Sequence, residues 1–225
     1  MFAIYSPNLP EYAIAFYGAA MAGGINTTVN PLYTPDECAK QLKDAGAKFL
    51  LTVPPFLDKA QQAAAQSDVD EVFVFGEAEG ATPFRALLTD DHEVPDVLVN
   101  PAEDLVALPY SSGTTGLPKG VMLSHRNIVG NIAQCCPIEG IQEGEVTVGI
   151  LPFYHIYGMT IILSMALYRG ATIITMPKFE MEDFLGLVEE HKIESGYLVP
   201  PIILGLAKHP VVDEYDVSSL DYITS

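Results

Sequence analysis

Residues 110–121 read Y-S-S-G-T-T-G-L-P-K-G-V, and no other stretch of the chain is as informative. The stretch follows an apolar run, Leu105 to Pro109, which predicts a strand. Its glycines let backbone N–H groups approach a ligand closely, its hydroxyl side chains add hydrogen-bond donors, and Lys119 adds a mobile positive charge. A loop of this composition is built to wrap an anion, and we expect that anion to be a polyphosphate.

This loop does not have the Walker sequence, which needs G-x-x-x-x-G-K followed by Ser or Thr. Here Pro118 precedes Lys119 and Gly120 follows it. The alternative is an ordinary Gly/Ser-rich connection between a strand and the next element. Twelve residues with this order of hydroxyls, glycines, proline and lysine favour the anion-binding loop.

Composition limits the classes of function. The 225 residues suffice for one domain with a substantial core or for two small ones. With 29 Asp and Glu against 11 Lys and Arg, the chain repels nucleic acid, so no nucleic-acid partner is expected. The longest apolar run, Gly158 to Tyr168, is shorter than the about 20 residues that span a bilayer, so no membrane span is expected. The three cysteines form no C-x-x-C pair, and a reducing cytoplasm is the expected location.

Short apolar runs alternate with helical patterns along the chain. This alternation predicts an α/β fold of mostly parallel sheets with helices on both faces. Thr34-Pro-Asp-Glu37 is a capping box that begins a helix, and Ile14, Tyr17 and Met21 are spaced for one face of another. Strands are expected at residues 2–5, 25–29, 49–53, 72–75, 105–109, 146–151, 171–176, 196–199 and 220–224. Helices are expected at about residues 11–22, 35–46, 56–66, 159–168, 181–191 and 200–208, with one more beginning at Ser124.

The loop at residues 110–121 resembles the phosphate-binding signature of the AMP-forming acyl-CoA synthetases, luciferases and related adenylating enzymes. Phe153-Tyr-His-Ile-Tyr-Gly158, Val199-Pro-Pro-Ile202 and residues 208–220 most resemble the 4-coumarate–CoA ligase branch. The resemblance runs over essentially the whole chain but covers less than half of such an enzyme. It implies two α/β subdomains, incomplete at both ends: residues 1–144 with the phosphate loop, and residues 145–225 with part of the acyl and coenzyme A site. We therefore expect an N-terminal fragment that is inactive by itself.

The resemblance also implies a reaction. Enzymes of this kind use ATP and Mg²⁺ to convert a small carboxylic acid to an acyl-adenylate, and then transfer the acyl group to coenzyme A. It implies that His155 lies beside the substrate carboxylate, that Tyr157 lines the acyl pocket and that Lys178 contacts a phosphate of coenzyme A. No metal ligand is expected among the protein's own side chains. The implied phosphate-binding residues are Ser111, Ser112, Gly113, Thr114, Thr115, Gly116 and Lys119, the last also catalytic together with His155.

Other interpretations stay open from the residues alone. A lone His flanked by aromatics, such as His155, is more often a core residue than a catalyst; Tyr157 has an alternative as a buried structural tyrosine, and Lys178 as a solvated lysine. Tyr154 and Ile161 depart from the coumarate branch, so the acid is left open between phenolic and fatty. The alternative functions are the adenylation domain of a peptide synthetase, a luciferase-like enzyme, and a non-catalytic nucleotide-binding fragment. Peptide synthetases usually lack the aromatic-flanked His.

Overall fold

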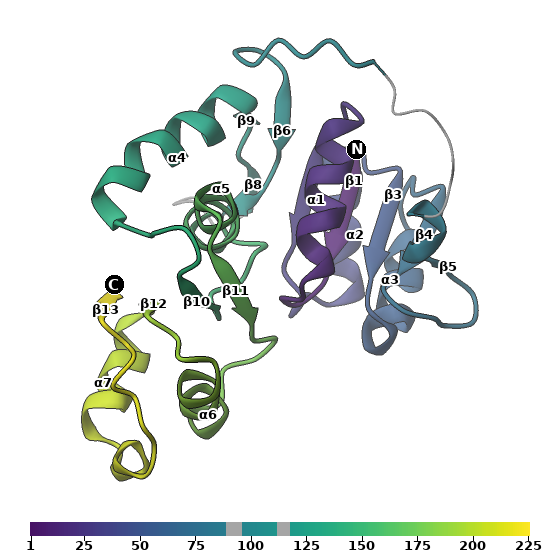
Figure 1. Cartoon of the computed structure of the whole chain (residues 1–225). Coiled ribbons are helices and arrows are strands. Elements are labelled where there is room, and N and C mark those ends of the chain that lie inside the picture. The colour runs from purple at the N-terminus through teal and green to yellow at the C-terminus, as the bar shows by residue number, and fades with distance from the viewer. Residues whose placement is uncertain (89–95, 112–117) are drawn as a thin grey trace. The chain divides into compact units, whose positions relative to one another are not determined.

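The computed structural model describes residues 1–88, 96–111 and 118–225 (Figure 1). The chain divides into two compact units. The first unit comprises Met1–Ser6 and Pro10–Ile128, and the second unit comprises Pro7–Leu9 and Val129–Ser225. The division into family subdomains after residue 144 stays a prediction.

The first unit is built on a seven-stranded sheet in the order β5-β4-β3-β1-β2-β6-β9. Neighbouring strands are parallel, except that β6 and β9 are antiparallel. The strands are β1 (Phe2–Tyr5), β2 (Asn26–Val29), β3 (Phe49–Thr52), β4 (Glu71–Val74), β5 (Thr82–Pro83), β6 (Leu105–Ala107) and β9 (Leu123–Ser124).

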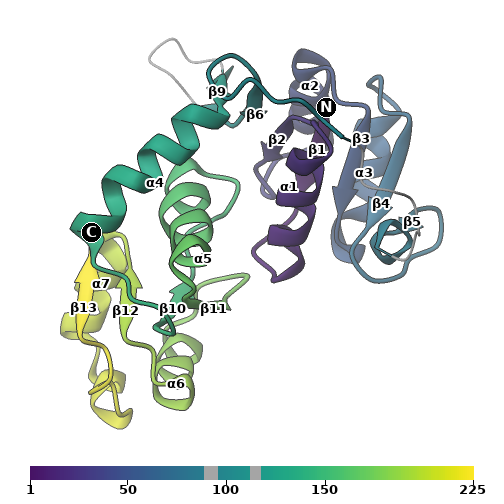
Figure 2. The same cartoon turned by 45° about the horizontal axis from the view of Figure 1, so that its top comes forward.

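The order of these strands determines where the helices lie. The chain passes from β1 to β2 on one side and then back across β1 to β3. Because parallel crossovers are right-handed, α1 (Glu11–Met21) and α2 (Pro35–Ala45) cover opposite faces of the sheet, as Figure 2 shows. Helix α3 (Leu57–Ala64) packs beside α2. The core on that face includes Tyr5 and Leu50 from the strands with Leu42 and Ala60 from the helices.

Helix α2 begins and ends where its sequence predicts. The Thr34 hydroxyl accepts a hydrogen bond from the Glu37 backbone N–H, and the Glu37 carboxylate accepts one from the Thr34 N–H at 2.8 Å. Gly46 ends the helix with φ at 66°, in the left-handed region where glycine has no Cβ penalty. The capping box is therefore confirmed.

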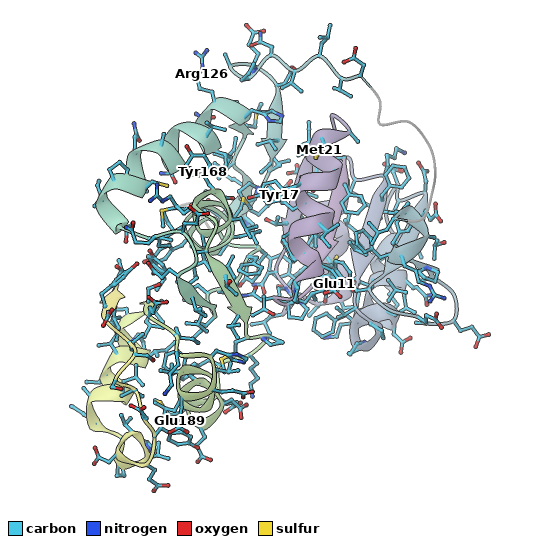
Figure 3. All side chains as sticks on the ribbon, viewed as in Figure 1. Glu11, Tyr17, Met21, Arg126, Tyr168 and Glu189 are labelled. Carbon is cyan, nitrogen blue, oxygen red and sulfur yellow. The ribbon has the colours of Figure 1, made fainter. Side chains whose placement is uncertain are left out.

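Helix α1 is present, but the face indicated by Ile14, Tyr17 and Met21 is not the buried one. Ile14 is 50% exposed, whereas Tyr12 and Phe16 are buried. Met21, labelled on this helix in Figure 3, is 67% exposed. The helix is apolar almost all round, so the spacing of its apolar residues does not single out one side.

The second unit is built on a parallel sheet in the order β11-β10-β12-β13. Its core includes Val148, Phe184, Leu185 and Leu198. Helix α4 (His125–Glu139) spans the boundary between the units in the chain. The other elements are β10 (Val146–Gly149), a π-helix (Gly158–Met165), α5 (Ala166–Arg169), β11 (Thr172–Thr175), α6 (Met181–His191), β12 (Ser195–Tyr197), α7 (Pro200–Lys208) and β13 (Tyr222–Thr224).

These two sheets confirm the expected α/β class with mostly parallel strands. The α-helix expected at residues 159–168 is instead a π-helix that continues into α5. Within it, the Ser164 hydroxyl donates to the Met159 carbonyl, five residues earlier, at 2.7 Å. Hydroxyls that bond back to helix carbonyls compete with the regular ladder, and the apolar period of the sequence does not report this.

No helix among residues 1–88, 96–111 and 118–225 is both long and apolar enough to cross a membrane.

Candidate functional site

The candidate phosphate loop is closed at its base by a two-stranded antiparallel hairpin, β7 (Tyr110–Ser111) and β8 (Lys119–Gly120). Ser111 pairs with Lys119 across this hairpin, and both are exposed. Because cross-strand partners share one face, a hydroxyl and an ammonium group lie together at the base of the loop. The other expected members, Ser112, Gly113, Thr114, Thr115 and Gly116, lie outside the described residues.

The hairpin begins near the carboxyl end of β6. The backbone N–H of Leu108 donates to the Asn26 carbonyl on β2 at 2.7 Å, and the N–H of Val121 donates to the Pro109 carbonyl at 2.8 Å. Ligands of parallel α/β sheets bind outside the carboxyl ends of the strands, so this is an expected place for a ligand loop.

The sequence analysis attributes the glycines of this stretch to close approach of a ligand, but the structure gives another cause for Gly120. A Cβ atom there would lie 3.1 Å from the Leu108 side chain and 3.3 Å from Cζ of Tyr110. The space that a larger residue would need is filled by the protein's own side chains. Gly120 therefore allows the Tyr110 ring to lie across β8, rather than allowing a ligand to approach.

A second group of candidate residues follows β10 in the second unit, and Asn8 organises its backbone. The Asn8 side chain is 4% exposed. Its Nδ2 donates to the carbonyls of Gly149 at 2.8 Å and Leu151 at 2.9 Å, and its Oδ1 accepts from the Phe153 N–H at 2.8 Å. The sequence alone gives no sign of this role.

His155 lies on the segment that Asn8 holds. Its side chain is exposed, so it is not a packed core residue. Its Nδ1 accepts a hydrogen bond from the Tyr157 backbone N–H at 3.3 Å, and the His155 backbone N–H donates to the Pro152 carbonyl at 3.0 Å. In the neutral imidazole an accepting Nδ1 puts the proton on Nε2. His155 can therefore present an N–H donor to a carboxylate.

Tyr157 is half-buried and packs edge-on against Tyr197, with ring centroids 6.4 Å apart and planes at 78°. Burial raises the pKa of Tyr157, and the negative charge of Glu139 raises it further. Tyr197 is fully buried at the end of β12, the strand beside β10. Sequence reasoning missed Tyr197, because a tyrosine inside a short apolar strand has the same pattern as a core residue.

Gly158 permits a close backbone approach at the start of the π-helix. A Cβ atom at this position would lie 2.2 Å from the Pro152 carbonyl oxygen and 2.8 Å from that of Leu151. Atoms of the backbone cannot move aside as a side chain can. The aromatic segment 153–158 therefore depends on Gly158 to turn into its helix.

Lys178 follows β11 on the surface of the second unit. It is exposed and forms an ion pair with the exposed Glu180. The hydrogen bond that the Lys178 ammonium donates to the Glu180 carboxylate, together with the negative charge of Glu180, raises the pKa of Lys178, so the ammonium keeps its proton. A phosphate ligand at this position must compete with the Glu180 carboxylate.

The loop, its hairpin and the α/β units are matched by one family. The family model described as AMP-binding enzyme matches residues 1–225. The chain belongs to the AMP-binding enzyme family. This AMP-binding chain is 44% identical over 227 residues to 4-coumarate--CoA ligase 1 of Solanum tuberosum and 42% identical over 226 residues to 4-coumarate--CoA ligase 1 of Petroselinum crispum. These matches cover 99% and 97% of the chain, but only 42% and 41% of the two ligases.

Solved structures show the same fold in related proteins. A red-emitting luciferase from Phrixothrix hirtus superposes with a TM-score of 0.87 at 31% identity, over 99% of this chain and 56% of that one. A long-chain-fatty-acid-CoA ligase from Archaeoglobus fulgidus superposes with a TM-score of 0.88 at 26% identity, over 99% and 44%. The AMP-binding chain thus spans about half or less of the proteins that it matches.

Proposed function

We propose that the protein containing this chain is an AMP-forming acid–thiol ligase. It activates a small carboxylic acid with ATP to an acyl-adenylate and transfers the acyl group to coenzyme A. The observation that carries this proposal is the 44% identity to a 4-coumarate--CoA ligase over 99% of the chain. The phosphate-loop sequence at residues 110–121 supports it. The specific acid stays open between phenolic and fatty acids.

The chemistry explains why these residue types are needed. A carboxylate must attack the α-phosphorus of ATP while pyrophosphate leaves, so an anion meets a polyanion and negative charge grows on the leaving group. Loop hydroxyls and N–H groups at Ser111, Ser112, Gly113, Thr114, Thr115 and Gly116, with the Lys119 ammonium, would hold and neutralise that charge. The Nε2–H of His155 would orient the carboxylate, and Tyr157 would contact the acyl group.

Mg²⁺ is proposed as the companion of the ATP phosphates. In the part of the chain that the structure describes, no three His, Cys, Asp or Glu side chains gather to hold a metal ion. These residues do not form a dedicated metal cage. Mg²⁺ often binds through substrate phosphates and water with few protein ligands, and such a site needs no cage.

The full-length protein tests the proposal by ATP–pyrophosphate exchange against a panel of phenolic, medium-chain and long-chain acids. We expect exchange that depends on one class of acid, followed by thioester formation when coenzyme A is added. Exchange without thioester formation would favour a luciferase-like or peptide-synthetase reaction. No exchange with any acid would overturn the proposal.

Substitution of Lys119 tests the loop. In the full-length protein, Lys119→Ala should lower the rate of adenylation about ten- to a hundredfold, because one charge-assisted contact of roughly 1.5–3 kcal/mol is lost on the pyrophosphate side. Folding should be unaffected, since Lys119 is exposed. Lys59→Ala on α3 is the matched control, since it removes another exposed lysine. Equal exchange rates in both variants would remove the loop from its proposed role.

Substitution of Lys178 separates the two half-reactions. Lys178→Ala should leave acyl-adenylate formation intact and raise the KM for coenzyme A, because the phosphate lies far from the reacting thiol and contributes uniform binding. Glu180→Gln should do the opposite and lower this KM, since it frees the ammonium from its exposed ion pair. Steady-state kinetics with coenzyme A varied measure both. An unchanged KM in the two variants would leave Lys178 as a solvated lysine.

A further inference from the structure

Two polar connections run from helix α2 to the segment that carries the phosphate loop. The first connection is buried. Nε2 of Gln41 donates to the Thr27 hydroxyl at 3.0 Å, and that hydroxyl donates to the Leu108 carbonyl at 2.9 Å. Gln41 is 4% exposed and Thr27 is fully buried. The relay therefore fixes the chain two residues before the hairpin begins.

The second connection reaches the hairpin itself. The Tyr110 hydroxyl donates to Oδ2 of Asp44 at 2.5 Å, and a hydrogen bond to a carboxylate is stronger than one between neutral groups. Burial raises the pKa of Tyr110, and the Asp44 carboxylate raises it further, so the phenol keeps the proton that it donates. Asp44 lies near the end of α2, and Tyr110 is the first residue of β7.

An open space adjoins both the hairpin and α2. A cavity of about 500 Å³ lies between them, lined by Lys40, Gln41 and Asp44 from the helix and by Tyr110 and Pro118 at the hairpin. Close packing cannot fix a segment across an open space of this size. The polar contacts at its edge therefore set the position of the hairpin base on this side.

The Tyr110 ring is held between two neighbours. One side of the ring lies over Gly120 on the opposite strand, where a Cβ atom would be 3.3 Å from Cζ. The hydroxyl at its far end is fixed by Asp44. The ring thus connects the helix to both strands of the hairpin, and these strands carry the first and last residues of the loop.

We propose that Asp44 is a positioning residue for the phosphate loop, acting through Tyr110. By fixing the hairpin base, it aligns Ser111 and Lys119 for a polyphosphate. A catalytic arrangement that is held in place loses less entropy on binding than one that must be assembled. The inference rests on the proposed use of ATP for its functional consequence, but the tether itself can be measured without ATP.

Kinetics of the full-length protein test the functional half. Tyr110→Phe should raise the KM for ATP and lower the adenylation rate, with a combined loss of about tenfold in kcat/KM, the lower end for one hydrogen bond to a charged group. Asp44→Asn should have a smaller effect in the same direction, because its amide oxygen can still accept. The KM values for the acid and for coenzyme A should not change. The double variant should be no worse than Tyr110→Phe alone, because both changes act on the same contact, which Asp44→Asn weakens by removing its charge and Tyr110→Phe removes. Asp36→Asn is the control, since it removes a charge from the same helix away from the hairpin.

Amide hydrogen exchange tests the tether without ATP. In the 225-residue chain, Asp44→Asn should speed exchange at Lys119 to Val121 several-fold relative to the unsubstituted chain, while Asp36→Asn should not. Unchanged exchange together with an unchanged KM for ATP, or strictly additive effects of the two substitutions, would overturn the proposal. A third outcome separates the two ideas. If Asp44→Asn speeds exchange but the unsubstituted full-length protein uses no ATP, the tether is upheld and the proposed function is rejected.

Discussion

Gly158→Ala is expected to destabilise the second unit by roughly 3 kcal/mol or more, at the upper end of overpacking substitutions. The added Cβ would lie 2.2 Å from the Pro152 carbonyl oxygen, and the two nearest neighbours besides that oxygen are also backbone atoms. Relief of this overlap requires the segment that carries His155 to move relative to the π-helix. Urea denaturation of the chain, followed by circular dichroism and by amide exchange in β10 and β12, measures the loss.

A glycine-to-alanine substitution elsewhere in this unit should have the opposite effect on stability. Gly186 lies inside α6, where a Cβ atom would meet only the Tyr215 ring at 4.0 Å. Alanine is favoured over glycine in a helix interior by about 1 kcal/mol, so Gly186→Ala should stabilise the unit by up to that amount. If Gly158→Ala behaved like Gly186→Ala, the close approach at Pro152 would not exist in solution.

Asn8→Asp is expected to destabilise the second unit nearly as much as Gly158→Ala. The amide of Asn8 donates to two carbonyls and accepts from one N–H, and a carboxylate can only accept. The substitution would remove the Asn8 donor from both carbonyl oxygens, although that of Gly149 keeps the Met176 N–H at 3.1 Å, and it would bring negative charge against both. An unsatisfied buried group costs about 1–3 kcal/mol, and a charged one costs more. Equilibrium unfolding should therefore show a loss of roughly 3 kcal/mol or more for Asn8→Asp.

The pH dependence and a control make this prediction specific. Burial without a cation raises the folded-state pKa of the introduced carboxyl above its unfolded value, so part of the lost stability should return as the pH falls through that folded pKa. Asn100→Asp is the control. Asn100 is exposed, and its side-chain oxygen accepts from the Ala102 N–H at 3.2 Å, a role that a carboxylate can replace. Equal stability of the two variants would contradict the role of Asn8.

The sequence predicts the elements that have a local cause. The capping box at Thr34 is contained in four residues, strand β1 is a continuous apolar run, and β3 is one from Phe49 to Leu51. It does not predict which side of α1 is buried, because that depends on the crossover that places the helix. The two-residue strands β7 and β8 are also missed, since a pattern needs more residues than they have.

The candidate site is likewise only partly predictable from the sequence. The phosphate loop is a contiguous motif and is found from its residues. Asn8 and Tyr197 act on segments distant in sequence, and no local pattern connects Asn8 to a strand about 140 positions later. The sequence shows glycine at positions 120 and 158 but not why glycine is needed there. The cause is the set of atoms that a Cβ at each position would touch. Those atoms are known only once the chain is folded.

The placement of Pro7–Leu9 in the second unit has a consequence for how the chain acquires its fold. During synthesis Asn8 emerges long before its partners at Gly149, Leu151 and Phe153, and those partners reach it only after nearly all of the first unit has been made. Closing so long a loop is slow, and domains made first generally fold first. The second unit should therefore mature last, and a protein expressed from residue 129 onward should lack its Asn8 hydrogen bonds however long it is given to fold.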